Sequence, residues 1–498
     1  MHQLKIGALL SYTSIFINII TGLLYTPWMI SCIGQENYGL YTLAMSVISL
    51  FVFDFGLSSA ITRFISKYLA EGSQTQADNC LGMAYRFYLI IDIVMLLVLT
   101  CVFFFIPEIY KELTPSEVDR FKVVFVVASI FSVISFPFIP INGVLVAYEK
   151  FIQLRVCDVF NKLFVVATMT TCLLLDMGLY ALVIVNAIAG VITIGLKLFC
   201  INRYTPQRVN LYYFNYKEFK QLVGYSGWVT IKSLSQRCIM NISPSILGIM
   251  SGSKEIAILG IAITLESFTY TFASAISGMF LPRVSRDVAH NIDILPLMTK
   301  VGRLQVLIIG LILIGLFLFG HEFISLWVGS EYNKVYVCVI LMSIPSFFHL
   351  PQEIAQQAVY ALNKVKIESQ VYVLMAIINI IGAFVLSPQW GSIGISISIF
   401  VAYMIRTIGM DIIYYKKMNI NVFKFFNDTY KTYILLLIPL LLFGLLINKY
   451  LPFIGWFGFG FKIGVFVISY CFLTYRYFLN DFEKKLLVKP IMERIGKK

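Results

Sequence analysis

The chain has 498 residues, of which 59% are hydrophobic and only 13% are charged. Soluble domains are roughly 45–50% apolar and about 25% charged, so a chain of this composition cannot cover a water-facing surface. These values exclude a soluble enzyme, a disordered scaffold and a disulfide-rich secreted domain. The formal net charge of +13 does not indicate nucleic acid as a partner, because most Lys and Arg residues lie in short loops between apolar runs.

Apolar runs long enough to cross a bilayer recur along the whole chain. A hydrocarbon core of about 30 Å requires about 20 apolar residues in a helix, and the runs lack the two-residue alternation of a β-barrel strand. The first run is expected to be a membrane helix and not a cleavable signal, because no small-residue cleavage site follows it. We predict fourteen membrane-spanning helices, over residues 6–30, 38–62, 82–106, 121–147, 151–175, 178–200, 219–250, 255–281, 298–320, 333–361, 367–387, 391–415, 430–448 and 453–478.

The basic residues between these helices are unevenly divided. If the N-terminus is inside, 29 Lys and Arg residues fall on the inner side and seven on the outer side. Cytoplasmic loops carry an excess of Lys and Arg, so the division predicts that both termini are cytoplasmic.

An internal repeat with an offset near 218 residues divides the first twelve helices into halves. Pro27 corresponds to Pro244, and Gly34 corresponds to Gly252. Six helices per repeat preserve orientation, so the two repeats would be parallel. We therefore predict an all-α polytopic membrane protein with two six-helix lobes in a pseudo-twofold arrangement. The predicted parts are an N-terminal lobe, a C-terminal lobe, and two further helices with a basic tail, over residues 1–216, 217–420 and 421–498.

The seventh predicted helix carries two cations near the middle of the membrane, Lys232 and Arg237, together with Gln236 and Asn241. A charge at this depth is costly, so it indicates a function by default. The polar residues and the following Pro244 predict a kinked helix that lines a wet, cationic cavity. The alternative is that both cations pair with acids on neighbouring helices.

The fifth predicted helix places Arg155, Asp158 and Lys162 on one face, at spacings of three and four residues. One interpretation is an ion pair between Asp158 and Lys162 within the helix. The other is that this face lines a cavity and leaves Lys162 for the substrate.

Three acidic residues lie well inside the second, third and eighth predicted helices. Each could neutralise a buried cation, or bind the Na⁺ or H⁺ that couples transport to an ion gradient. They are Asp54, Asp92 and Glu266. The sequence has no P-loop, no GxSxG or HExxH motif and no loop large enough for an active site, so no enzyme activity, metal or organic cofactor is predicted.

A local pattern near the N-terminus carries a family resemblance. It consists of the segment 33–41, with Tyr38 and Gly39, and the segment 54–60, which is followed by Arg63. This pattern resembles that of bacterial polysaccharide-biosynthesis membrane proteins, the O-antigen and capsule repeat-unit flippases. Their superfamily also contains the peptidoglycan-precursor flippases and the multidrug and toxin extrusion antiporters.

The resemblance implies a V-shaped cavity that opens alternately to the two sides of the membrane, and a groove for a prenyl tail beside the last two helices. The implied function is translocation of undecaprenyl-pyrophosphate-linked oligosaccharide across the bacterial cytoplasmic (inner) membrane, for O-antigen (lipopolysaccharide), capsule or exopolysaccharide synthesis. Besides this substrate and membrane lipids, a polysaccharide polymerase and a chain-length regulator are candidate partners.

A buried pyrophosphate requires fixed cations, and the attached sugar requires amides and hydroxyls. The cations predicted to bind the substrate are Arg63, Lys162, Lys232 and Arg237, and the predicted polar lining is Asn18, Gln236 and Asn241. Charge balance or ion coupling is assigned to Asp54, Asp92, Asp158 and Glu266.

Two alternative functions remain open. An ion-coupled multidrug antiporter would place an acid in an open pocket without a cation beside it. A membrane-embedded glycan polymerase or ligase would need a sizeable outer loop bearing Arg or His, and the sequence predicts none.

Overall fold

The computed structural model describes most of the chain, and all that follows concerns these residues. They are 19–51, 54, 57–277, 280, 284, 286–288, 290, 292–362, 364–451, 455–480 and 483–484. Across these ranges the protein is helical and contains no strand. Residues 1–18, which include Asn18, lie outside the described part.

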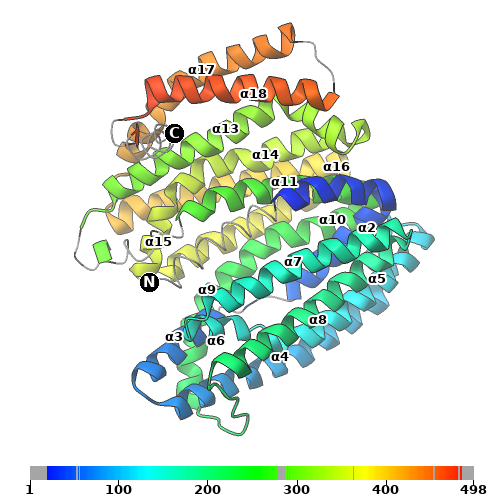
Figure 1. The fold of residues 1–498 in the computed structure, drawn as a ribbon, viewed down its shortest axis with the longest axis vertical. Coiled ribbons are helices and arrows are strands. Elements are labelled where there is room, and N and C mark those ends of the chain that lie inside the picture. Colours follow the sequence, from blue (N-terminus) through cyan, green and yellow to red (C-terminus); the bar gives the residue numbers. More distant parts are fainter. Residues whose placement is uncertain are drawn as a thin grey trace, which may run out of the picture. The chain divides into compact units, whose positions relative to one another are not determined.

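Helices follow one another with short connections throughout the described chain (Figure 1). After a first helix over Ile19–Ile33, the larger helices are α2(Gln35–Phe51), α3(Leu57–Ala70), α4(Gln74–Ile109), α5(Pro115–Ser135), α6(Ile141–Ala147), α7(Phe151–Leu174), α8(Gly178–Tyr204), α9(Tyr216–Arg237), α10(Ser243–Met250), α11(Ser253–Ser277), α13(Leu295–Trp327), α14(Asn333–His349), α15(Glu353–Ala361), α16(Val365–Met418), α17(Val422–Tyr450) and α18(Gly455–Leu473). Short helical turns join some of them, namely η1(Phe136–Phe138), η2(Cys238–Ile242), η4(Ser330–Tyr332), η5(Leu350–Gln352) and η6(Thr474–Phe478).

Each of the fourteen predicted membrane helices coincides with helix in the described chain, the first of them only in part. Nine helical segments of this part are long and apolar enough to cross a membrane. One of them, α16, contains two predicted spans, because Gly391 adopts a φ of 55° and breaks the helix there. The predicted all-α, multi-pass fold is therefore confirmed.

The second predicted span differs from a single helix. α2 ends at Phe51, α3 begins at Leu57, and Asp54 between them is not helical. The Oδ1 atom of Asp54 accepts a hydrogen bond from the backbone N–H of Ser58 at 3.1 Å, which satisfies one free donor at the start of α3.

The predicted repeat is visible in the backbone of two connecting glycines. Gly34 has a φ of 81° and Gly252 has a φ of 82°. Glycine adopts this left-handed conformation without steric cost, and each residue directly precedes a helix, α2 or α11. Corresponding positions of the two repeats therefore have the same turn conformation.

Two compact units make up the chain, one formed by residues 1–263 and 365–402 and the other by 264–364 and 403–498. The predicted lobe boundaries after residues 216 and 420 are not tested by this division and stay a prediction.

In the first unit, α2 packs against α5 and α10, and α3 packs against α4, α6 and α9. The helices α7 and α8 form an antiparallel pair that joins the others through α5 and α6. Asn215 begins α9, since its side chain accepts hydrogen bonds from the backbone N–H groups of Lys217 and Glu218.

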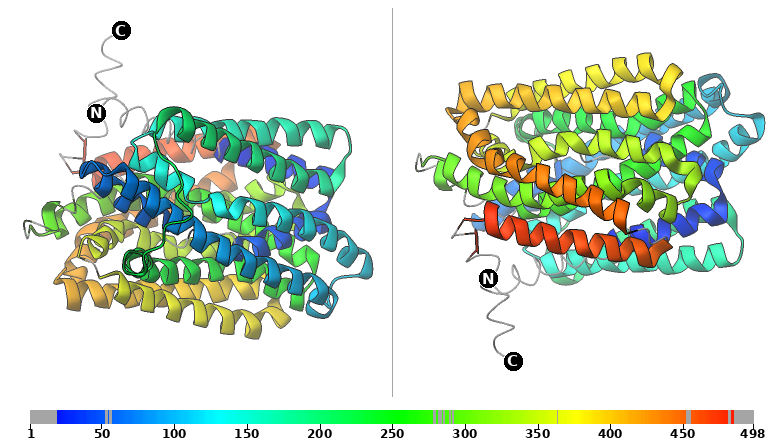
Figure 2. Two further views of the ribbon diagram at one scale, coloured as in Figure 1. Left: turned by 90° about the horizontal axis from the view of Figure 1, so that it is seen from below. Right: turned by 90° about the horizontal axis from the view of Figure 1, so that it is seen from above.

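In the second unit, α13 is the central helix and contacts α14, α15, α17 and α18. Figure 1 shows α13 between α14 and the α17–α18 pair, and the right-hand view of Figure 2 shows α17 and α18 side by side. Lys462 of α18 forms an ion pair of 2.9 Å with Glu322 of α13, which links these two helices.

Candidate functional site: a polar cavity beside α9

The helix that carries the predicted cations changes its geometry at Arg237. α9 ends there, and the next turn, η2, is a π-helix that leads into α10. Pro244 has no backbone N–H and its ring collides with the preceding turn of a regular α-helix, which explains the wider turn just before it. The predicted kink thus takes the form of a π-helical segment.

A cavity of about 510 Å³ lies beside this segment, within the first unit. Its lining comes from one face of α9 and η2, from the end of α2 and from the connection between α2 and α3. The lining residues are Ser49, Asp54, Val229, Ser233, Gln236, Arg237, Met240 and Asn241. Three side chains that the sequence assigned to a polar cavity, Arg237, Gln236 and Asn241, are therefore brought together.

Arg237 is the cation of this cavity. Its Nη1 atom donates a hydrogen bond of 2.9 Å to the backbone carbonyl of Ser49, which lies in the last turn of α2. The carbonyls at the end of a helix carry a partial negative charge, so this contact stabilises the guanidinium. Asp54 lines the same cavity, so one cationic and one anionic side chain share it.

Asp54 is held in place by two donors. Besides the backbone N–H of Ser58, the hydroxyl of Tyr88 donates to its Oδ1 atom at 3.1 Å. Tyr88 is completely buried in α4 and its ring packs against Phe136. The carboxylate is therefore fixed to α3 and α4, while Arg237 is tied to α2.

Lys232 has a different environment, although it lies only five residues before Arg237. Its Nζ atom is 2.5 Å from Oε1 of Glu368 in α16 and 5.0 Å from the ring centroid of Tyr372. Lys232 is 5% exposed and Glu368 is fully buried, and Lys232 is not among the residues that line the cavity. This is the alternative arrangement left open by the sequence, in which a cation pairs with an acid on a neighbouring helix.

In α7, Asp158 pairs with two other cations. Arg155 Nη1 lies 3.4 Å from Asp158 Oδ2, and Lys197 of α8 lies 2.9 Å from Asp158 Oδ1. The predicted Asp158–Lys162 pair is wrong, because Lys197 from the adjacent helix occupies that position. Lys162 is exposed on α7 and makes no ion pair with any described residue.

The other predicted site residues are not among those that line this cavity. Arg63 is exposed on α3. Asp92 is partly buried in α4, and its Oδ1 atom has no hydrogen-bond partner in the described part of the chain. Glu266 is buried in the second unit and accepts a hydrogen bond from Ser346 at 3.4 Å. The described ranges contain no group of three or more side chains that could hold a metal ion.

Sequence reasoning missed Ser49, Tyr88 and Glu368. Ser49 contributes a backbone carbonyl, which no side-chain pattern reveals. Tyr88 and Glu368 lie near the predicted inner ends of their spans, where polar residues are ordinary. An acid that lies four to five helical turns from any loop would have been noticed in the sequence. Glu368 instead lies in the first turn of α16, three residues after Val365.

Comparisons with known proteins agree with the fold and add the family. A family described as "Polysaccharide biosynthesis protein" matches residues 4–288. A Shigella flexneri protein described as an O-antigen transporter is 23% identical over 229 residues, which are 44% of this chain and 53% of that protein. The chain thus matches about half the length of this curated relative.

Solved structures of transporters share the whole fold. The lipid II flippase MurJ in an inward closed conformation superposes with a TM-score of 0.71 at 13% identity, over 94% of this chain and 98% of that one. An inward-facing multidrug resistance MATE family transporter of the MOP superfamily gives 0.66 at 11% identity, over 80% of this chain and 96% of that one.

The helical architecture therefore defines a multi-pass membrane protein, and the family match together with the transporter fold indicates a transporter and not an enzyme. The chain belongs to the polysaccharide biosynthesis protein family. The predicted family and fold class are confirmed.

Proposed function

We propose that the protein is a flippase that moves undecaprenyl-pyrophosphate-linked oligosaccharides across the cytoplasmic membrane of a bacterium by alternating access, without ATP hydrolysis. Family membership and the relative described as an O-antigen transporter support a lipid-linked glycan as substrate. The termini would be cytoplasmic, as the excess of Lys and Arg in the inner loops indicates.

The observation that carries this proposal is the composition of the cavity beside α9. Arg237 supplies a cation, and Gln236, Asn241 and Ser233 supply amides and a hydroxyl in the same lining. A guanidinium can bind two oxygens of a phosphate at once, while amides and hydroxyls exchange hydrogen bonds with sugars in both directions. The cavity thus combines the two chemistries of a pyrophosphate-linked sugar.

Asp54 offsets the charge of Arg237 in the cavity lining. A bound pyrophosphate would meet Arg237 but be repelled by Asp54, which limits how tightly the anion is held. A carrier has to release its substrate on the other side, so moderate binding of this kind suits transport. Ion coupling through Asp54, by Na⁺ or H⁺, stays a proposal.

The test is translocation of a fluorescent undecaprenyl-pyrophosphate oligosaccharide between the leaflets of proteoliposomes. We expect Arg237→Ala to lower the initial rate about tenfold or more, as loss of a charged hydrogen bond of about 1.5–3 kcal/mol implies. Arg237→Lys should retain part of the rate, because it keeps the charge but not the bidentate geometry. Arg155→Ala, which removes an arginine from an exposed pair on α7, is the matched control.

A multidrug antiporter is the second candidate, because Asp54 lines the cavity and MATE transporters share the fold. The cation beside Asp54 favours an anionic substrate. If wild-type liposomes move no lipid-linked glycan under any Na⁺ or H⁺ gradient but exchange a cationic drug for these ions, the antiporter is the correct function and the flippase proposal fails.

A further inference from the structure

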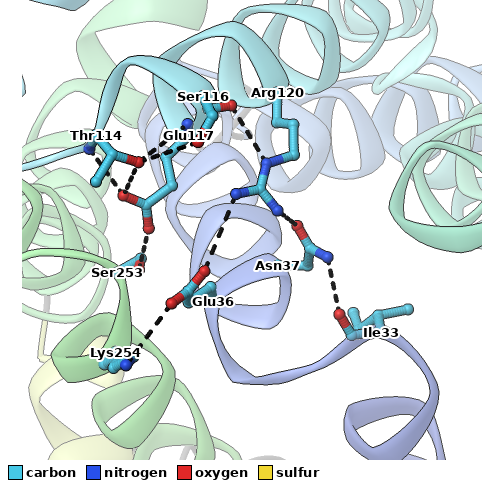
Figure 3. Close-up of polar contacts among 9 residues, drawn as sticks. All are labelled: Ile33, Glu36, Asn37, Thr114, Ser116, Glu117, Arg120, Ser253 and Lys254. Carbon is cyan, nitrogen blue, oxygen red and sulfur yellow. Dashed lines mark hydrogen bonds and ion pairs between the residues drawn. The ribbon is translucent and has the colours of Figure 1, made fainter.

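The ends of α2, α5 and α11 that the charge count places outside meet in a dense polar cluster, shown in Figure 3. It joins helices of the first repeat, α2 and α5, to the start of α11 in the second repeat. All of its members belong to the first unit. The cavity beside α9 lies at the opposite end of α2.

The buried centre of the cluster is the contact between Glu117 and Ser253. The hydroxyl of Ser253 donates to Oε1 of Glu117, and the two residues are 6% and 5% exposed. The other carboxylate oxygen, Oε2, accepts hydrogen bonds of 2.8 Å from both the backbone N–H and the hydroxyl of Thr114, which form the cap of α5. Glu117 is therefore fixed rigidly to α5, and Ser253 ties α11 to it.

Two exposed ion pairs surround this centre. Glu36 lies 4.0 Å from Arg120 and 3.7 Å from Lys254, and Arg120 also donates a 2.7 Å hydrogen bond to Asn37. Solvent-exposed ion pairs contribute at most about 1 kcal/mol each. The buried Glu117–Ser253 contact is thus the stronger link between the repeats.

The backbones of α2 and α11 also approach closely beside this cluster. A side-chain carbon added to Gly39 would lie 2.1 Å from the carbonyl oxygen of Ser253. One turn further along, a carbon added to Gly260 would lie 2.8 Å from Thr42 of α2. Only glycine permits these contacts, so α2 and α11 are sealed against each other from their first turns.

The distance between the cavity and the close contact of α2 with α11 follows from helix geometry. From Gln35 to Ser49, α2 rises by about 21 Å at 1.5 Å per residue. The lining residue Ser49 therefore lies well along α2 from the turns in which α2 and α5 contact α11.

We propose that Glu117, Ser253 and Gly39 form a lock that holds the outer ends of the two repeats together and must open before the cavity can face outward. This inference rests on the proposed transport cycle and adds the element that controls its outward step. It assigns to Glu117 and Ser253 a conformational role and not a role in binding substrate.

The test measures access to the cavity and needs no substrate. Met240, which lines the cavity, is changed to cysteine in a protein whose nine native cysteines are replaced, and a membrane-impermeant maleimide is added outside spheroplasts. Ser253→Ala should raise the initial labelling rate about fivefold, because a two-state equilibrium that loses one buried hydrogen bond shifts by about this factor. Gly39→Ala should raise it further, since the methyl group forces the helices apart.

Two matched controls carry the same chemical changes elsewhere. Ser116→Ala removes a hydroxyl from the same end of the molecule, but this hydroxyl contacts only Thr114 of its own segment. Gly195→Ala adds a methyl group to α8 where no atom lies within 4 Å. Labelling of the Ser253→Ala and Gly39→Ala proteins at the rate of these controls would overturn the lock.

The outcome is separable from that of the proposed function. If the variants raise outside labelling but liposomes move no lipid-linked glycan, the lock stands and the substrate is wrong. If the glycan moves but labelling does not change, the function stands and the lock fails.

Discussion

Two cations on α9, five residues apart, have opposite surroundings. Lys232 is enclosed by a carboxylate and an aromatic ring of α16, whereas Arg237 faces a cavity and is held by a helix-end carbonyl of α2. At 3.6 residues per turn, five residues place two side chains about 140° apart around a helix. Lys232 packs against α16, while Arg237 borders the polar cavity.

The difference separates a charge that is buried against a neighbouring helix from a charge that lines a cavity. Lys232 forms a short ion pair with Glu368, so its charge is compensated within the protein. Arg237 lines the cavity together with Asp54, so its guanidinium lies where a ligand in the cavity would meet it. Depth in the membrane alone does not distinguish these two roles.

The largest effect should follow from removing Lys232. Lys232→Ala leaves the fully buried carboxylate of Glu368 without its cation, and breaking a buried ion pair in this way costs about 3–5 kcal/mol. We expect a much lower yield of monodisperse protein and a clearly lower Tm in detergent, measured by fluorescence-detected size-exclusion chromatography.

A double variant distinguishes the ion pair from simple packing. Lys232→Met with Glu368→Gln removes both charges and keeps the volume, so much of the stability should return. Lys162→Ala, which removes an exposed lysine of α7, is the control and should leave Tm unchanged. A wild-type Tm for Lys232→Ala would show that the pair does not stabilise the protein.

Arg237→Ala should have a smaller effect on stability than on transport. The variant loses one hydrogen bond to Ser49, and water can enter the cavity in its place, so we expect a loss of about 1.5 kcal/mol. Measuring the Tm of Arg237→Ala and of Lys232→Ala under the same conditions checks that Lys232→Ala is the less stable variant. If Arg237→Ala proves the less stable of the two, Arg237 has a structural role and the comparison is reversed.

The sequence was sufficient to predict the positions of the helices, but it was not sufficient to predict the partners of the charged side chains. Runs of 20 apolar residues and the Gly34–Gly252 offset are local properties, and both correspond to what the structure contains. The partners of polar atoms depend on helix rotation and on distant segments. Arg406 illustrates this: it is 3% exposed within α16 and donates to Gln356 of α15, which lies 50 residues earlier in the chain.

The candidate site shows the same limit. Gln236, Arg237 and Asn241, which the sequence grouped, all line the cavity, because they occupy one short stretch of α9 and η2. Lys232 was grouped with them by depth, but its side chain pairs with Glu368 of α16. The position of Asp54 beside Arg237 depends on the break between α2 and α3, and neither apolar periodicity nor charge spacing encodes that contact.

The smallest effect should come from Tyr88, which is one step removed from the cavity. Tyr88→Phe removes the donor to Asp54 but keeps the ring that packs against Phe136, so the fold should lose only about 0.5–1 kcal/mol. Asp54 keeps the backbone N–H of Ser58, but its carboxylate becomes freer to turn toward Arg237. We therefore expect a closer Asp54–Arg237 pair, weaker attraction of an anionic substrate, and a translocation rate reduced about two- to fivefold, in proportion to one neutral hydrogen bond.

The comparison of Tyr88→Phe with Tyr88→Phe/Asp54→Asn in the liposome assay checks this cause: the double variant lacks the competing carboxylate, so it should be faster than Tyr88→Phe alone. An equal or slower rate would mean that Tyr88 acts only through packing, and that Asp54 does not set the field around Arg237.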